Sequence, residues 1–309
     1  MHPAFSVLVF TVLSGAGYGL ILLMVLGHLI GLGELQDRNL LLSGGVLSLV
    51  LISTGLMAST LHLANPKNAW RAFSRFKTSW LSREAVFAIL FYPFVILYLA
   101  GIWSMGAQLS AIFATAGIIS AALALVTLFC TSMIYASLKT IRQWNNALTP
   151  VNYLVLGIMS GSLLLLAVQS LVAGSVSQQL QQSAMALLVL GVAVKAIYFF
   201  WIGKPSGSTI KTATGFTQAS VRLLDQGHSS NGFLNNEFGY SVAANKLLRI
   251  RLIMLAVAFV LPLLLLLTAN SLLLLIAALI TLAGLLAERW LFFAEARHVV
   301  RLFHGDQRV

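Results

Sequence analysis

Two ionisable residues, His62 and Glu84, lie at the ends of long apolar segments, where a titratable side chain is costly and is therefore a candidate for function. The imidazole of His62 titrates near neutral pH. The carboxyl group of Glu84 can take up or release a proton if burial raises its pKa. The two residues flank one connection, so the helix ends beside it should bring them together as a proton-transfer pair. Taken singly, each residue also has a structural explanation. Glu84 could be stabilised by the dipole of a helix, and His62 could be an interfacial side chain whose polar end stays in water.

A few other groups inside apolar segments could carry chemistry. Lys195 lies about two helical turns from a segment end, so it either extends its ammonium group to the boundary or pairs with a carboxylate such as Glu288. Cys130 is the only cysteine and cannot supply the roughly four ligands of an iron–sulfur cluster, so we interpret it as a small buried apolar residue. His28 and His62 lie near opposite faces of the predicted membrane bundle, and the other histidines are terminal or in loops, which predicts no haem.

The apolar segments that position these residues predict an all-α integral membrane protein. Hydrophobic residues make up 59% of the 309 residues and charged residues only 9%, against about a quarter in soluble proteins. A membrane-crossing helix needs about 20 apolar residues, and strand-like alternation is absent, which excludes a β-barrel. We predict one transmembrane domain, residues 1–309, with a bundle of eight helices at residues 5–32, 40–63, 85–103, 110–138, 151–174, 183–201, 248–268 and 271–286.

The distribution of positive charge predicts the orientation of the bundle. The net charge is +11, and all but Arg38 and Lys195 of the 19 Lys and Arg residues lie in or beside the connections after the second, fourth and sixth helices or in the C-terminal tail. Lys and Arg concentrate on the cytoplasmic side of membrane proteins. We therefore place the connections 64–84 and 202–247, the tail 287–309 and both termini in the cytoplasm. The charge thus reflects topology and does not indicate nucleic-acid binding; a partner protein or anionic lipid on this face is the secondary interpretation.

Local signals predict several helix ends. Ser82 is a potential N-cap of the third helix, Thr149-Pro150 has the pattern of a cap followed by proline, and Asn270 is a potential cap of the last helix. Beyond residue 286, Arg289, Phe293, Arg297 and Arg301 recur every four positions, which predicts a continued helix with a basic stripe. That stripe is either a docking surface or a solvated helix end.

Two small-residue motifs lie inside the predicted helices. They are SGAGYG at residues 14–19 and GIMSG at residues 157–161. The first is similar to a nucleotide-binding loop, but no strand precedes it. Small residues allow close approach of membrane helices, so we interpret both motifs as packing sites.

The connection between the second and third helices resembles the same region of the dimethyl sulfoxide reductase membrane-anchor family. The resemblance rests on residues 61–66 (LHLANP), 69–73 (AWRAF) and 79–84 (SWLSRE). The chain start, HPAFS at residues 2–6 together with SGAGYG, is similar to the first helix of that family. Ala64 stands where the family pattern leads us to expect glycine. Eight spans also match the family, so the likeness covers the whole topology.

The resemblance implies a haem-free anchor subunit in the bacterial inner membrane. It would hold two cytoplasmic partners, a molybdopterin catalytic subunit and an iron–sulfur subunit, in a heterotrimer that exchanges electrons with membrane quinone. The positions matching His62 and Glu84 are linked in the family to quinol binding, and we add Arg71, Arg83 and Lys195 to this candidate quinone and proton-transfer site. Candidate docking residues are Lys67, Arg75, Lys77, Arg289, Arg297 and Arg301. The complex would reduce a sulfoxide or oxidise sulfite, and the first-helix motif is closer to the sulfite-oxidising branch.

Two other functions compete with a quinone-reactive anchor. A secondary transporter often has broken helices and polar residues at mid-membrane, and Pro93, Pro262 and Lys195 suit that pattern. Against it, the two halves show no repeat, and the polar groups gather at one boundary. A purely structural anchor without a quinone site is the second alternative.

Overall fold

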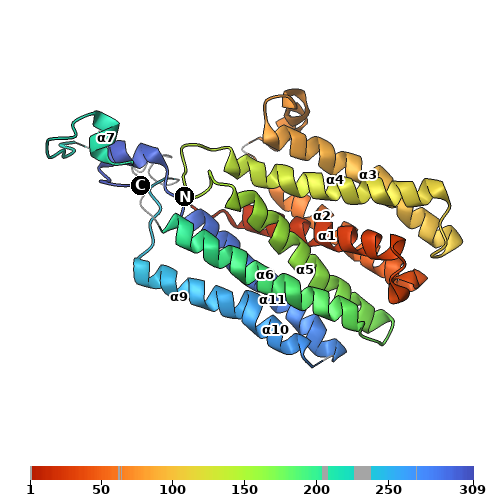
Figure 1. Ribbon diagram of the computed structural model, residues 1–309. Helices are drawn as coiled ribbons and strands as arrows, with labels where there is room; N and C mark the ends of the chain where they lie inside the picture. Colours follow the sequence, from red (N-terminus) through yellow and green to blue (C-terminus); the bar gives the residue numbers. More distant parts are fainter. Residues whose placement is uncertain (1, 62, 64, 204–207, 226–237, 269) are drawn as a thin grey trace.

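Long helices form the structure, a computed structural model that describes residues 1–309 except 1, 62, 64, 204–207, 226–237 and 269. Eight helices are long and apolar enough to cross a membrane, and they lie alongside one another in one bundle (Figure 1). They are α1 (Phe5–Leu29), α2 (Arg38–Thr60), α3 (Trp80–Met105), α4 (Ala111–Ala136), α5 (Leu148–Val172), α6 (Gln178–Ile202), the α9–η3–α10 segment (Ala244–Leu255, Ala256–Val260 and Leu261–Leu266) and α11 (Ser271–Ala294). The described residues include no strand, so the prediction of eight helical spans is confirmed.

Short elements gather mainly at one end of the bundle. The 3₁₀ helices η2 (Pro66–Arg75) and η4 (Val299–His304) and the short helix α7 (Ile210–Thr214) lie at the end where both chain termini are found, and η1 (Gly33–Gln36) lies at the other (Figure 1). We call the end with the termini the basic end, because most Lys and Arg residues belong to its connections and tail. There the tail is tied to the α4–α5 connection, since the amide of Val299 donates to the carbonyl of Thr140 at 3.0 Å.

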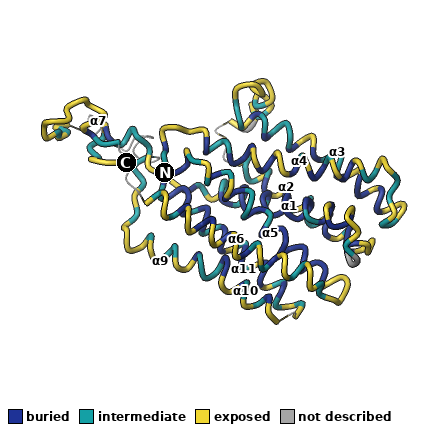
Figure 2. The backbone as a smooth tube through the Cα atoms, in the orientation of Figure 1, coloured by how far each residue is buried: buried dark blue, intermediate teal, exposed yellow. Residues whose placement is uncertain are grey.

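Helices α1 and α5 form the centre of the bundle. In their apolar stretches 72% and 78% of the residues are buried, against 22–39% in the other spans, and Figure 2 shows this buried centre. Their backbones meet at glycine: a Cβ on Gly19 would lie 2.0 Å from the carbonyl oxygen of Gly157, and one on Gly161 would lie 2.2 Å from the carbonyl carbon of Gly19. The packing role predicted for both small-residue motifs is therefore confirmed.

The outward faces of the peripheral helices are exposed, as Figure 2 shows for the outside of the bundle, and they carry large apolar side chains. Ile96 on α3 is 54% exposed, Ile118 on α4 56% and Leu264 on α10 54%. Contiguous apolar surface of this kind is unfavourable in water, whereas lipid chains solvate it. The exposed faces thus agree with a membrane-embedded bundle.

Two helix starts differ from the prediction. Helix α3 begins at Trp80 because the hydroxyl of Ser79 accepts from the amide of Ser82 at 3.4 Å, so the predicted cap at Ser82 was wrong and Glu84 lies in the second turn. Helix α5 begins at Leu148, before the predicted Thr149-Pro150 signal. The Thr149 hydroxyl instead donates to the carbonyl of Trp144 at 2.8 Å.

The predicted cap of the last helix is confirmed. The side chain of Asn270 accepts from the amides of Leu272 and Leu273, at 3.0 and 3.3 Å. This cap satisfies two amides that have no partner inside α11.

The two intrahelical prolines behave differently. Helix α3 runs through Pro93 without interruption. Pro262 follows a π-helical turn, η3, which divides the seventh span into three helical pieces. Proline lacks an amide hydrogen and crowds the carbonyl of the preceding turn, and a π turn is one way to accommodate it.

Candidate functional site

Glu84 is a buried carboxylate in the second turn of α3. Only 4% of its surface is exposed, and its Oε1 accepts a hydrogen bond from the hydroxyl of Thr131 on α4. Thr131 is also buried. Because a buried carboxylate needs hydrogen-bond partners, this contact between neighbouring helices positions the group.

The Thr131 hydroxyl has one hydrogen and two acceptors within reach. Besides Glu84, the carbonyl oxygen of Thr127 lies 3.0 Å from it. When Glu84 is ionised, the hydroxyl can donate to the carboxylate. When Glu84 is protonated, the carboxyl group can donate to Thr131, which then donates to Thr127. The arrangement therefore accommodates both protonation states of Glu84, as a proton-transfer group requires.

Other polar side chains surround Glu84 on the neighbouring helices. Tyr18 on α1 is only 1% exposed and lies within electrostatic reach of Glu84; its ring packs edge-on against Phe91 of α3. The Tyr18 hydroxyl is in polar contact with Thr127, but no described residue lies at both hydrogen-bonding distance and angle from it. The region thus offers a second buried group able to bond a polar ligand.

The connection before α3 is held against the helix by Ser82 and Arg83. The Ser82 hydroxyl donates to the carbonyl of Ala72 in η2. The Arg83 guanidinium donates to the carbonyls of Phe76, at 3.0 Å, and Lys77, at 2.7 Å. These contacts fix η2 near the start of α3 and turn Arg83 toward the connection, so the structure does not bring Arg83 to the Glu84 carboxylate.

The remaining residues predicted for this site have different surroundings. His62 lies outside the described residues, so its pairing with Glu84 stays a prediction. Arg71 is exposed on η2, with its guanidinium carbon 5.6 Å from the centre of the Trp70 ring. Lys195 belongs to a second buried cluster, which is separate from the Glu84–Thr131 contact.

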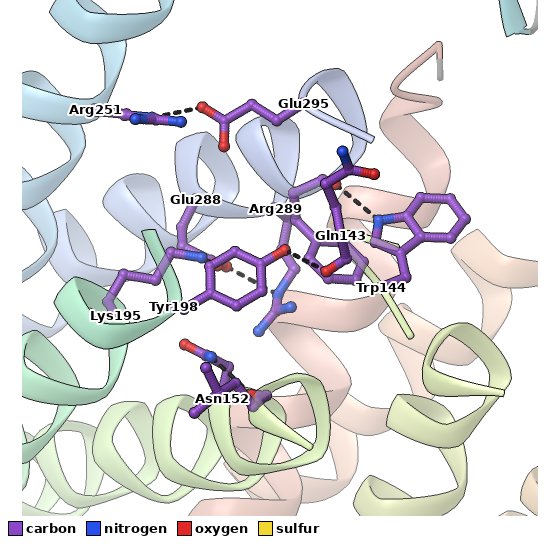
Figure 3. A network of polar contacts seen from close by, with 11 residues as sticks. Gln143, Trp144, Asn152, Lys195, Tyr198, Arg251, Glu288, Arg289 and Glu295 are labelled. Atoms are coloured by element: carbon purple, nitrogen blue, oxygen red, sulfur yellow. Dashed lines mark hydrogen bonds and ion pairs between the residues drawn. The ribbon is translucent and has the colours of Figure 1, made fainter. Parts of the chain in front are cut away.

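This second cluster joins α6 to α11 inside the bundle (Figure 3). Lys195 is paired with Oε1 of Glu288, and Nε of Arg289 lies 3.1 Å from Oε2 of Glu288. The three side chains, which we call the buried triad, are at most 5% exposed. Of the two alternatives for Lys195, pairing with Glu288 is therefore confirmed. Two cations and one anion leave the triad with a formal charge of +1.

The predicted basic stripe along the C-terminal segment was wrong. Helix α11 ends at Ala294, and a 3₁₀ turn follows at Val299–His304. Arg289 is buried, with its guanidinium carbon 3.8 Å from the centre of the Tyr153 ring, so it cannot dock a partner. Arg297 is exposed, and Arg301 pairs with Asp306 at 3.0 Å.

The docking residues on the α2–α3 connection do lie at the surface. Lys67, Arg75 and Lys77 are all exposed at the basic end. Whether they contact a partner stays a prediction.

His28 and Cys130, two buried residues singled out from the sequence, have surroundings that fit a role in packing the bundle. Both ring nitrogens of His28 are engaged, Nδ1 with the hydroxyl of Tyr98 and Nε2 with the carbonyl of Ala107, each at 2.8 Å. Cys130 is buried as a free thiol. In the part of the chain that the structure describes, no group of three or more His, Cys, Asp or Glu side chains is arranged to hold a metal.

Sequence reasoning missed Thr131, Tyr18 and Tyr153. Each is one of several polar residues scattered along an apolar helix, and most Ser and Thr hydroxyls in helices bond their own backbone. Only the packing of α1, α4 and α5 brings these residues near Glu84 and Arg289.

The fold and its buried polar groups define a multi-pass membrane protein with ionisable side chains placed inside the bundle near one end. Residues 1–294 match the family model described as DMSO reductase anchor subunit (DmsC). The chain belongs to this family. It is similar to the sulfite dehydrogenase subunit designated C in Allochromatium vinosum, with 35% identity across 98% of this chain and 99% of the relative. It is also similar to anaerobic dimethyl sulfoxide reductase chain YnfH of Escherichia coli, with 24% identity across 52% of this chain and 55% of that relative. The family resemblance inferred from the α2–α3 connection is thus confirmed.

Proposed function

We propose that this protein is the quinone-reactive membrane anchor of a molybdopterin oxidoreductase, with Glu84 as the proton-transfer group of its quinone site. The observation that carries the proposal is the buried Glu84–Thr131 contact, which accommodates both protonation states of the carboxyl group. Family membership supports the anchor role. Similarity over nearly the full length to a sulfite dehydrogenase subunit favours the sulfite-oxidising type over the sulfoxide-reducing type.

The chemistry requires protons and electrons to arrive by different routes. Oxidation of sulfite with water gives sulfate, two protons and two electrons. Reduction of a quinone consumes two electrons and two protons and gives the quinol. Glu84 would donate a proton to a quinone oxygen, so that one O–H bond breaks as the other forms, and would then be reprotonated. A sulfoxide reductase would run the quinone step in reverse.

Electrons must come from a partner subunit. This chain contains one cysteine, whereas an iron–sulfur cluster needs about four cysteine ligands. We place the partner on the basic end, where Lys67, Arg75 and Lys77 are exposed, and orient that end toward the cytoplasm by the positive-inside rule. The resulting assembly is a heterotrimer of anchor, iron–sulfur subunit and molybdopterin subunit in a bacterial inner membrane.

The helix ends beside the α2–α3 connection suit a lipid-soluble carrier. Leu61, directly after α2, is 80% exposed, and Leu81, three residues before Glu84 in α3, is 46% exposed. Apolar side chains there would let a quinone approach from lipid, and the buried groups of Glu84 and Thr131 would hydrogen-bond its oxygens. His62 directly follows Leu61 in the sequence and is the second candidate titratable group of this site.

Substitution of Glu84 by Gln in the purified complex tests the proposal. Glutamine keeps the size and the hydrogen-bonding oxygen but cannot transfer a proton. We expect quinone-linked turnover to fall by about two orders of magnitude or more, in line with loss of a general acid–base group. Turnover with a soluble dye that takes electrons from the iron–sulfur subunit should remain unchanged, which shows that the complex is assembled.

The same experiment separates the alternative functions. Wild-type quinone-linked turnover in both Glu84→Gln and His62→Ala would favour a purely structural anchor. A chain that purifies alone, without a cluster-bearing partner, would favour a secondary transporter; the family assignment lends transport no support.

A further inference from the structure

A small cavity lies between Glu84 and the buried triad. Its walls come from α1, α4, α5 and α11, and every residue that lines it is buried. The volume is ≈ 10 Å³, which matches the roughly 10–15 Å³ that a single water molecule needs. Its lining includes Thr131, the residue bonded to Glu84, and Arg289 of the triad.

The cavity has polar walls with unused hydrogen-bonding groups. Tyr153 and Arg289 both line it and are 3% and 4% exposed. Tyr153 and Arg289 are in polar contact with each other, but neither Tyr153 Oη nor Arg289 Nη1 has a described partner at both hydrogen-bonding distance and angle. The hydroxyls of Ser14 and Ser160 donate within their own helices, which leaves their oxygens able to accept. A water here would find the two to four partners that buried waters have.

Electrostatics favours proton transfer between the two sites. The triad carries a formal charge of +1, and ionised Glu84 carries −1. Moving one proton from the triad to Glu84 makes both sites neutral and so removes two uncompensated charges from the low-dielectric interior. Lysine can release its proton when buried, whereas arginine stays charged. Lys195 is therefore the proton donor of the triad, and Glu288, its ion-pair partner, is the first acceptor.

We propose that one water in this cavity connects the Lys195–Glu288–Arg289 triad to Thr131 and Glu84, forming an internal route that reprotonates the quinone site. The inference rests on the proposed function of Glu84. The Nζ–H bond of Lys195 breaks as an O–H bond forms on Glu288. Glu288 does not line the cavity itself but is paired with Arg289, which does; the proton passes from Glu288 beside Arg289 to the cavity water, which releases another through the Thr131 hydroxyl to Glu84. Tyr153 and Arg289 act as positioning residues that hold the water.

Glu295 provides the connection to bulk water. It directly follows the end of α11, about two helical turns beyond Glu288. It is within electrostatic reach of Lys195, and Arg251 donates to it at 2.6 Å (Figure 3). Glu295 lines a polar groove of ≈ 880 Å³ at the basic end, beside Gln143 and Arg301. Solvent in this groove supplies the proton that reloads Lys195.

Three substitutions in the purified complex test the route. Lys195→Met removes the proton donor far from Glu84 and leaves Glu288 paired with Arg289. Thr131→Val removes the hydroxyl at nearly constant volume. Ser160→Val fills the cavity and removes one acceptor for the water. We expect quinone-linked turnover to fall about tenfold or more in all three variants, as for loss of a proton-transfer step.

Additional readouts separate proton transfer from binding and folding. Thr131→Ser should restore turnover, because it retains the hydroxyl. The Kd of a quinone analogue and dye-linked turnover should stay within about twofold of wild type in Lys195→Met. Thr281→Val on α11, which changes a buried hydroxyl outside the cavity, is the matched control and should leave turnover unchanged.

The outcomes distinguish this route from the proposed function. Wild-type quinone-linked turnover in Lys195→Met and Ser160→Val, with Glu84→Gln inactive, would overturn the route and leave the quinone site standing. Loss of quinone-analogue binding in Lys195→Met would also overturn it. Wild-type turnover in Glu84→Gln would overturn the proposed function and the route together.

Discussion

The ammonium group of Lys195 on α6 is paired with the carboxylate of Glu288 on α11 in the interior of the bundle, and neither side chain is more than 1% exposed. Glu288 also pairs with Arg289, at 3.1 Å. One carboxylate therefore compensates two buried cations. Removal of the anion and removal of one cation must then have different consequences for stability.

We expect Glu288→Met to destabilise the protein by about 3–5 kcal/mol, because it leaves two buried cations without a counter-charge. Lys195→Met leaves the Glu288–Arg289 pair neutral and should cost less than about 2 kcal/mol, as replacement of buried ionic groups by apolar ones often does. Thermal unfolding of both variants in detergent measures the difference. Equal losses in the two variants would show that Arg289 does not compensate Glu288.

This cluster shows how far sequence reasoning reaches. An intramembrane lysine needs an anionic partner, so the sequence alone suggested Glu288. The same reasoning placed Arg289 on an exposed stripe, because a repeat of four residues identifies a helix face without showing what that face contacts. Arg289 is buried because Tyr153, which is distant in the chain, covers it.

Elsewhere too, features set by neighbouring residues could be predicted from the sequence, whereas contacts between distant residues could not. The eight spans and the Asn270 cap depend on neighbouring residues, and they were predicted. Two serines compete to cap α3, and the structure selects Ser79, while Ser82 bonds Ala72 in the preceding connection. The Glu84–Thr131 contact and the cavity beside it arise from helix packing, for which the sequence carries no signal.

The close contact between α1 and α5 should make Gly19 sensitive to the smallest substitution. The methyl group of Gly19→Ala would lie 2.0 Å from the Gly157 carbonyl oxygen, so the two backbones must separate. We expect a loss of about 1–3 kcal/mol or more, as for overpacked cores. Gly15→Ala on the same helix is the control, since its methyl group would meet Leu128 at 3.8 Å, an ordinary contact. Equal thermal stability of the two variants would contradict backbone-to-backbone packing at Gly19.

His298 should make the C-terminal tail sensitive to pH. Its Nδ1 accepts from the amide of Val300 at 3.1 Å and so caps η4, and partial burial lowers the pKa of His298 below its ordinary value of 6.5. Only the neutral imidazole can accept at Nδ1. The stabilisation is therefore present above the unfolded-state pKa and is lost as the pH falls through the lower folded-state value.

Hydrogen exchange of residues 298–304, corrected for its intrinsic pH dependence, measures this effect. We expect faster exchange on acidification below about pH 6.5, the ordinary value for histidine. His298→Asn is the control, because asparagine also caps helices but does not titrate. A pH response of the same size in His298→Asn would assign the effect to another group.

Thr281 on α11 offers a test of the cost of a buried hydroxyl without a partner. The residue is fully buried, and no described residue lies at hydrogen-bonding distance and angle from its Oγ1. Valine has nearly the same shape and removes the desolvated oxygen, a change that is neutral or stabilising when the hydroxyl makes no bond. We therefore expect Thr281→Val to leave the melting temperature of the complex unchanged or to raise it.

Thr131→Val in helix α4 should lower the melting temperature, because there the hydroxyl bonds Glu84 and its loss leaves a buried carboxylate without that donor. A lower melting temperature for Thr281→Val would show that its hydroxyl has a partner in the assembled protein.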